Sequence, residues 1–110
     1  MEFQRLRERA LEIRQQYADL ERVRYGRSWT GQELALGFVG DVGDLMKLVQ
    51  AASSVREIPD AEARLAHELA DCLWSVLVLA DAYGVDVERA FLDTMDELEQ
   101  RLSTQGLGAS

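Results

Sequence analysis

Hydrophobic residues recur three and four positions apart through most of this chain, which is the spacing of one face of an α-helix. Four such segments are expected, at about residues 2–24, 30–52, 59–83 and 87–102. A single proline, and few glycines outside the turns, also favour helices over strands. The pattern therefore predicts an all-α fold, a four-helix bundle formed by one domain that covers residues 1–110.

Turn and cap residues mark the expected ends of these helices. Gly26 can adopt the left-handed conformation that stops the first helix. Thr30 and Glu33 have the spacing of a capping box at the start of the second. Asp86 is suited to the N-cap of the fourth helix. Residues 103–110 are expected to form a disordered tail.

The second and third helices carry more apolar surface than one neighbour can cover. Apolar residues surround most of the second helix, which predicts a central position for it. Gly37, Gly40 and Gly43 recur along it, and each costs up to about 1 kcal/mol relative to alanine. We therefore expect a helix or a ligand to approach this backbone closely. Residues 72–80 are apolar nearly all round, which predicts a subunit interface and a homodimer or tetramer.

The net charge and the single cysteine indicate which partners and which cellular location to expect. The formal net charge of −8 argues against binding to a nucleic-acid polymer or to an anionic membrane surface. The longest apolar run, residues 72–80, is about half of what spans a bilayer, and the charged N-terminus lacks an apolar signal core. Cys72 has no partner for an internal disulfide, so we expect a reducing, cytoplasmic location.

Two acidic pairs share the same spacing inside otherwise apolar helices: Asp41 with Asp44, and Glu68 with Asp71. Residues three apart lie on one helix face, and carboxylates are rarely buried unless they are paired or hold a metal. Oxygen-only ligands favour Mg²⁺, with Mn²⁺ as a substitute. The pairs therefore predict two helices that clamp a divalent cation, although solvated acidic faces would give the same spacing. A di-iron site fits poorly, because His67 does not have the Glu-x-x-His spacing.

Two residues of the second helix and its cap have two interpretations each. Lys47 lies one turn beyond Asp44 and could contact a phosphate as a point charge, or it could be a surface lysine. Trp29 precedes the Thr30 cap and could stack on a nucleobase. It could equally pack on Leu34 as a hydrophobic staple.

The third helix offers further candidates next to its acidic pair. Trp74 and Ser75 lie one turn past Asp71, where they could shape a pocket, although a core role for Trp74 is the alternative. His67 shares a face with Asp71, so it is either an outer-shell partner of the metal site or a plain surface histidine.

Three motifs together resemble the MazG-like all-α nucleoside triphosphate pyrophosphohydrolases: residues 36–47, residues 67–74 and residues 79–86. The resemblance covers about residues 25–100. The family motif begins with two adjacent glutamates; the first is Gly40 here, as in the branch that resembles dCTP pyrophosphatases. The resemblance implies Mg²⁺-dependent cleavage of a nucleoside triphosphate to a monophosphate and pyrophosphate, in nucleotide-pool house-cleaning. It also implies metal-binding and catalytic roles for Asp41, Asp44, Glu68 and Asp71.

The chain departs from the family pattern in two places. Aspartates stand at positions 41 and 44, where the family favours glutamate, so each carboxylate reaches one methylene less far. The end of the fourth helix offers only Arg101 for contact with phosphate. An alternative is therefore a catalytically inactive helical interaction or nucleotide-sensing module. The base, the sugar and the number of metal ions are not specified by these residues.

Overall fold

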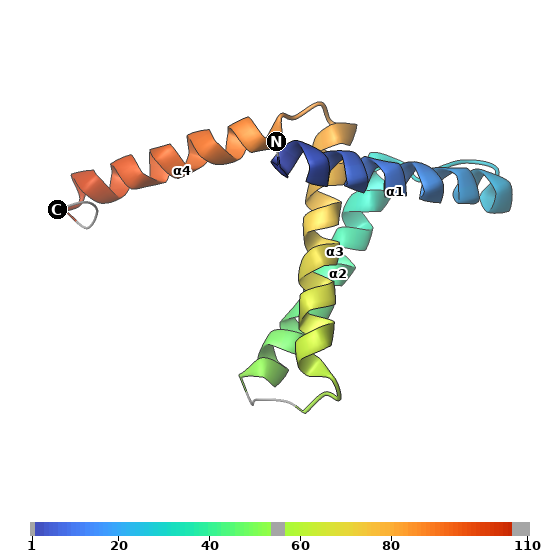
Figure 1. Ribbon diagram of the computed structural model, residues 1–110, viewed down its shortest axis with the longest axis horizontal. Coiled ribbons are helices and arrows are strands. Elements are labelled where there is room, and N and C mark those ends of the chain that lie inside the picture. Colours follow the sequence, from blue (N-terminus) through green and yellow to red (C-terminus); the bar gives the residue numbers. More distant parts are fainter. Residues whose placement is uncertain (1, 54–56, 107–110) are drawn as a thin grey trace.

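The computed structural model describes residues 2–53 and 57–106, and this part of the chain forms four α-helices without a strand (Figure 1). The predicted all-α class is confirmed, and each expected helix is present. The helices are α1 (Glu2–Tyr25), α2 (Gly31–Ala52), α3 (Ala61–Ala82) and α4 (Val87–Thr104).

Local signals in the sequence set the helix ends as predicted. Gly26 has a φ of 78°, and its N–H donates to the carbonyl of Arg22 at 2.9 Å. Thr30 and Glu33 form the capping box, with each side chain accepting from the other residue's amide at 3.2 and 2.9 Å. Asp86 caps α4 by accepting from the Arg89 amide at 3.1 Å.

The predicted tail at residues 103–110 starts too early. Ser103 and Thr104 still belong to α4, where the Thr104 hydroxyl donates to the carbonyls of Gln100 and Arg101 at 2.8 and 3.0 Å. The Arg101 carbonyl also accepts the Gln105 N–H at 3.1 Å, so the helix ends with its last turn hydrogen-bonded. Residues 107–110, the rest of the predicted tail, lie outside the described part of the chain.

Helices α2 and α3 run antiparallel and side by side, and they make the most extensive contact in the molecule (Figure 1). Helix α1 crosses one end of this pair. It is joined to α3 by a hydrogen bond from Trp74 Nε1 to the Ala10 carbonyl at 3.0 Å and by an ion pair between Arg7 and Asp81 at 3.1 Å. Helix α4 leaves the same end and points away on the other side (Figure 1).

The four helices do not close into a bundle within one chain, and the predicted bundle of two or four chains stays a prediction. The radius of gyration is 17.5 Å, whereas a compact domain of this length has about 13 Å. The apolar stripe of α4 remains exposed, with Phe91 at 59%, Met95 at 41% and Leu98 at 42%. Because α4 packs on none of the other helices extensively, the chain alone leaves this stripe uncovered.

Helix α2 is also less central than predicted. Leu36 and Val39 are 72% and 68% exposed, because α3 covers only one side of the helix. A Cβ atom added to Gly37, Gly40 or Gly43 would meet no atom of the described residues within 4 Å. No other helix of the described chain therefore approaches the glycine row closely, and Gly37 lines the cleft between α1, α2 and α3, so the approach of a ligand or of a second chain stays a prediction.

The core is small and lies where α1 and α2 pack on α3. In the apolar run of residues 72–80, Leu77 and Val78 are buried, whereas Leu73 and Val76 are 48% and 37% exposed. The run is thus covered on part of its circumference only. None of the described helices combines the length and the apolar character that a bilayer crossing requires.

Candidate metal centre and adjoining cleft

Helices α2 and α3 bring three of the predicted acids together. Asp41, Asp44 and Glu68 each offer a carboxylate oxygen, and these oxygens lie within 4.8 Å of one another. The i, i+3 spacing places both aspartates on the face of α2 that meets α3, so their shorter side chains still reach the cluster. Such an oxygen-only donor set is the kind that Mg²⁺ and Mn²⁺ prefer.

Glu68 has an unpaired atom in this cluster. Its Oε2 is buried and has no hydrogen-bond partner among the described residues. Burial raises the pKa of Glu68, and the charges of Asp71, Asp41 and Asp44 raise it further against a smaller opposing effect of His67. An unsatisfied buried acceptor costs about 1–3 kcal/mol. A divalent cation would satisfy it, so the residues present fit such an ion.

The surrounding groups experience the same negative field. Burial raises the pKa of Asp41, and the charges of Asp71 and Asp44 add to the effect. The pKa of the Cys72 thiol is also raised, by burial and then by Asp41, Glu68 and Asp71. The thiol is therefore kept neutral, which disfavours a nucleophilic role for this cysteine.

Asp71, the fourth predicted ligand, lies beside the group of three and contacts His67. The distance from His67 Nε2 to Asp71 Oδ2 is 3.1 Å, within one turn of α3. The His67 side chain is 73% exposed, so this contact fits both interpretations of His67, the outer-shell partner and the surface histidine. The metal-binding roles of the four acids stay predictions.

A cleft of about 610 Å³ opens next to this cluster, between α1, α2 and α3. Asp41 and Asp71 stand in its lining. The volume lies within the range of small-molecule sites, about 300–1,000 Å³. The cleft is acidic at the end that meets the cluster, and aromatic and aliphatic side chains form much of its wall. These wall residues are Ile13, Tyr17, Trp29, Leu34 and Trp74.

The predicted pocket residues of α3 do line the cleft. Ser75 is buried there, and Trp74 combines both of the roles considered for it. The Trp74 indole anchors α1 through its bond to the Ala10 carbonyl and packs at a tilt against Tyr17, with 5.9 Å between ring centroids. It therefore joins two helices and forms part of the cleft wall.

Trp29 and Lys47 differ in their placement. Trp29 lines the cleft, and Tyr25 stacks on its indole with 5.2 Å between centroids. The Arg27 guanidinium lies 5.6 Å from the same ring. Lys47 is exposed and is not part of the cleft lining, so the geometry gives no support to its predicted phosphate contact.

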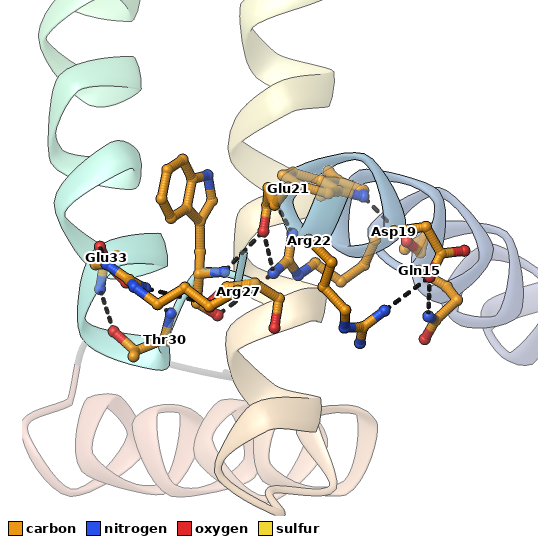
Figure 2. A network of polar contacts seen from close by, with 12 residues as sticks. Gln15, Asp19, Glu21, Arg22, Arg27, Thr30 and Glu33 are labelled. Carbon is orange, nitrogen blue, oxygen red and sulfur yellow. Dashed lines mark hydrogen bonds and ion pairs between the residues drawn. The ribbon is translucent and has the colours of Figure 1, made fainter. Parts of the chain in front are cut away.

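Sequence reasoning missed a buried ion pair on α1. Arg14 donates through Nη1 and Nη2 to the two carboxylate oxygens of Glu21, at 2.9 and 3.0 Å. Glu21 also accepts from the Trp29 amide at 2.7 Å, and Arg14 donates to the Trp29 carbonyl at 3.4 Å. Both side chains line the cleft, and Figure 2 shows Glu21 within this polar network. Their opposite charges, seven positions apart on α1, were the available signal.

The comparisons with known proteins agree with this geometry. Residues 30–104 match the model of the MazG nucleotide pyrophosphohydrolase domain, and the chain belongs to that family. Among curated proteins it is similar to dCTP pyrophosphatase 1 of Rattus norvegicus, with 37% identity over 75 residues. That alignment covers 64% of this chain and 44% of the rat protein, so the chain spans less than half of the relative's length. No solved structure gave a significant match. The resemblance inferred from the motifs is confirmed.

Proposed function

We propose that this protein is a magnesium-dependent nucleotide pyrophosphohydrolase that converts a nucleoside or deoxynucleoside triphosphate to its monophosphate and pyrophosphate. The observation that carries the proposal is the buried, unpaired Oε2 of Glu68, in an acidic cluster that borders a cleft of ligand size. Mn²⁺ is the expected substitute for Mg²⁺, because both accept oxygen ligands. Membership of the family supports the class of reaction.

The acidic end of the cleft is assigned to the phosphates. Magnesium bound there would neutralise phosphate charge and lower the pKa of a coordinated water. The carboxylates of the chain would hold this ion, and one of them would orient the attacking water. The four residues given these roles are Asp41, Asp44, Glu68 and Asp71.

The distribution of cationic side chains supports a metal requirement. Arg14 and His67 are the basic residues in the cleft lining, and both already contact carboxylates. Arg101 pairs with Glu97 at 3.5 Å on α4, which points away from the other three helices (Figure 1). The described lining of the cleft therefore offers little free positive charge to a triphosphate, and a bound cation would supply it.

The rest of the cleft is assigned to the nucleoside. Trp29 and Trp74 provide aromatic surface, and Ser75 provides a hydroxyl in a mostly apolar wall. A nucleobase can stack on such surface whatever its identity. The name of the rat relative makes dCTP the first nucleotide to test.

A pyrophosphate-release screen tests the function. The protein is incubated with Mg²⁺, inorganic pyrophosphatase and each common or modified deoxynucleoside triphosphate, and phosphate is measured with malachite green. Asp71→Asn is expected to abolish turnover while far-UV circular dichroism stays unchanged. Asp19→Asn, which removes an exposed carboxylate of α1, is the matched control. Unchanged turnover in the Asp71 variant would contradict the assignment.

The shortened acids of α2 support a second candidate, a catalytically inactive interaction or nucleotide-sensing module. Titration calorimetry with Mg²⁺ or Mn²⁺, in the presence of dCTP, separates the two. Binding of the ion without turnover indicates a sensor. Absence of any binding indicates an interaction module.

We also propose that the chain acts as a homodimer or tetramer in the cytoplasm. The exposed stripes of α2 and α4, which include Leu36, Val39, Phe91 and Leu98, leave more apolar surface than a monomer usually exposes. A second copy of the chain would cover it. Sedimentation equilibrium at micromolar concentrations should give two or four chain masses, and a monomer under these conditions would contradict the proposal.

A further inference from the structure

Glu21 is a buried carboxylate that the proposed reaction does not use. Only 5% of the residue is exposed, and the Arg14 guanidinium lowers the pKa of its carboxyl although burial opposes this. The family match begins at residue 30, so α1 and this ion pair lie outside it. The role of the pair therefore has to be read from its contacts.

Those contacts converge on Trp29. Glu21 accepts the Trp29 N–H at 2.7 Å, and Arg14 donates to the Trp29 carbonyl at 3.4 Å. Both main-chain polar groups of Trp29 are thus bound by the pair, while its indole stands in the cleft wall. Because the two hydrogen bonds fix the peptide groups on either side of the Cα atom, they restrict the direction in which the side chain leaves the backbone.

We infer that Arg14 and Glu21 are positioning residues that hold the Trp29 indole in the cleft wall and so set the affinity for the nucleoside part of the substrate. This inference rests on the proposed function. Neither residue is assigned a part in the chemistry, because the acidic cluster lies on α2 and α3, whereas the pair lies on α1.

The docking of α1 does not depend on this pair alone. The bond from Trp74 to the Ala10 carbonyl and the ion pair between Arg7 and Asp81 also hold α1 to α3. Loss of the Glu21 charge should therefore leave α1 in place and loosen Trp29. In kinetic terms, such a change removes binding that the substrate and the transition state share, which raises KM and leaves kcat unchanged.

The kinetic test compares Glu21→Gln with a matched substitution on the same helix. The glutamine directs an amide N–H₂ at the Arg14 guanidinium and loses the bidentate contact. We expect KM for dCTP, or for the best substrate of the screen, to rise about tenfold, part of what one base–aromatic stack contributes, with kcat within about twofold. Asp19→Asn breaks an exposed pair with Arg22 and should change neither constant. A fall in kcat at unchanged KM, or a KM equal to that of the control, would overturn the inference.

A second test does not require turnover. The chain has two tryptophans, so acrylamide quenching of each variant is measured with and without Trp29→Phe, and the difference reports Trp29 while Trp74 keeps its bond to Ala10. Glu21→Gln should increase the quenching of Trp29, whereas Asp19→Asn should not, with helicity of all variants checked by circular dichroism. If the wild-type protein hydrolyses no nucleotide, the proposed function fails and the quenching still decides the positioning role. Equal quenching in the two variants overturns that role even in an active enzyme.

Discussion

Glu21 in the cleft wall and Glu68 in the adjoining acidic cluster have opposite environments. Glu21 accepts hydrogen bonds from Arg14 and from the Trp29 amide, and its pKa is lowered. Glu68 has a buried oxygen without a partner in the described part of the chain, and its pKa is raised by burial and by neighbouring acids. The negative charge of a glutamate is thus compensated by a cationic side chain at Glu21, whereas at Glu68 it is uncompensated and faces other acids.

This difference separates a structural role from a functional one. A carboxylate whose counter-charge comes from its own chain is complete without a ligand. A carboxylate surrounded by other carboxylates is costly to bury, and it becomes favourable only when a cation arrives from solution. Perturbed acids of the second kind concentrate at functional sites, so the comparison supports Glu68 as part of the proposed metal centre.

The largest effect is expected from Glu68→Gln. Removing one ligand charge should lower turnover about 10³-fold, which corresponds to about 4 kcal/mol of transition-state stabilisation, and should abolish binding of Mn²⁺ measured by calorimetry. Glu21→Gln is the matched change at the compensated site and should keep wild-type metal affinity. Equal metal affinity in both variants would remove the distinction between the two glutamates.

Sequence periodicity was sufficient to predict the helices and to place Asp41, Asp44 and Glu68 on facing sides of two of them, but it did not reveal the contacts of Glu21. The capping box at Thr30 and the acidic pairs depend on residues three apart, a distance that the helix itself fixes. The Glu21 contacts depend on how the Gly26 turn folds Trp29 back onto α1, which no local spacing encodes. The surface that covers α4 could not be predicted for a related reason, because an apolar stripe does not encode its partner, and the stripe is uncovered within one chain.

A smaller effect, on stability, is expected from Arg14→Met. The pair is only 14% and 7% exposed at its side chains, so loss of Arg14 leaves a buried, uncompensated charge and should lower the free energy of unfolding by about 3 kcal/mol. Adding Glu21→Leu removes that charge and should recover part of the lost stability. The recovery is incomplete because the Trp29 amide then lacks its acceptor, which costs about 1 kcal/mol.

Urea unfolding of the single and double variants measures this cycle. Arg22→Met is the control, because its pair with Asp19 is 52% and 63% exposed and should contribute no more than about 0.5 kcal/mol. If the double variant is less stable than Arg14→Met, then the Glu21 carboxylate is not destabilising in the absence of Arg14, which contradicts this explanation.

The smallest effect is on the pH dependence of stability, and its sign should differ between the two glutamates. The folded-state pKa of Glu68 lies above its ordinary value of 4.5. Above pH 4.5 the folded protein therefore holds more protons than the unfolded chain at this site, and the contribution of Glu68 to stability falls as pH rises through the folded pKa. The folded-state pKa of Glu21 lies below 4.5, so its contribution is complete above that pH and is lost as pH falls through the lowered value.

Urea unfolding in EDTA separates the contributions of the two glutamates. The free energy of unfolding of Glu68→Gln is subtracted from that of the wild type to give the first difference, and that of Glu21→Gln is subtracted to give the second. The first difference should decrease with rising pH above 4.5, and the second should decrease with falling pH below it. Each slope is limited to about 1.4 kcal/mol per pH unit for one proton. Saturating Mg²⁺ should reverse the first slope, because the ion binds the ionised carboxylate, and should leave the second unchanged. Two slopes of the same sign would mean that Glu68 is compensated within its own chain, and the metal centre would then have lost its physical basis.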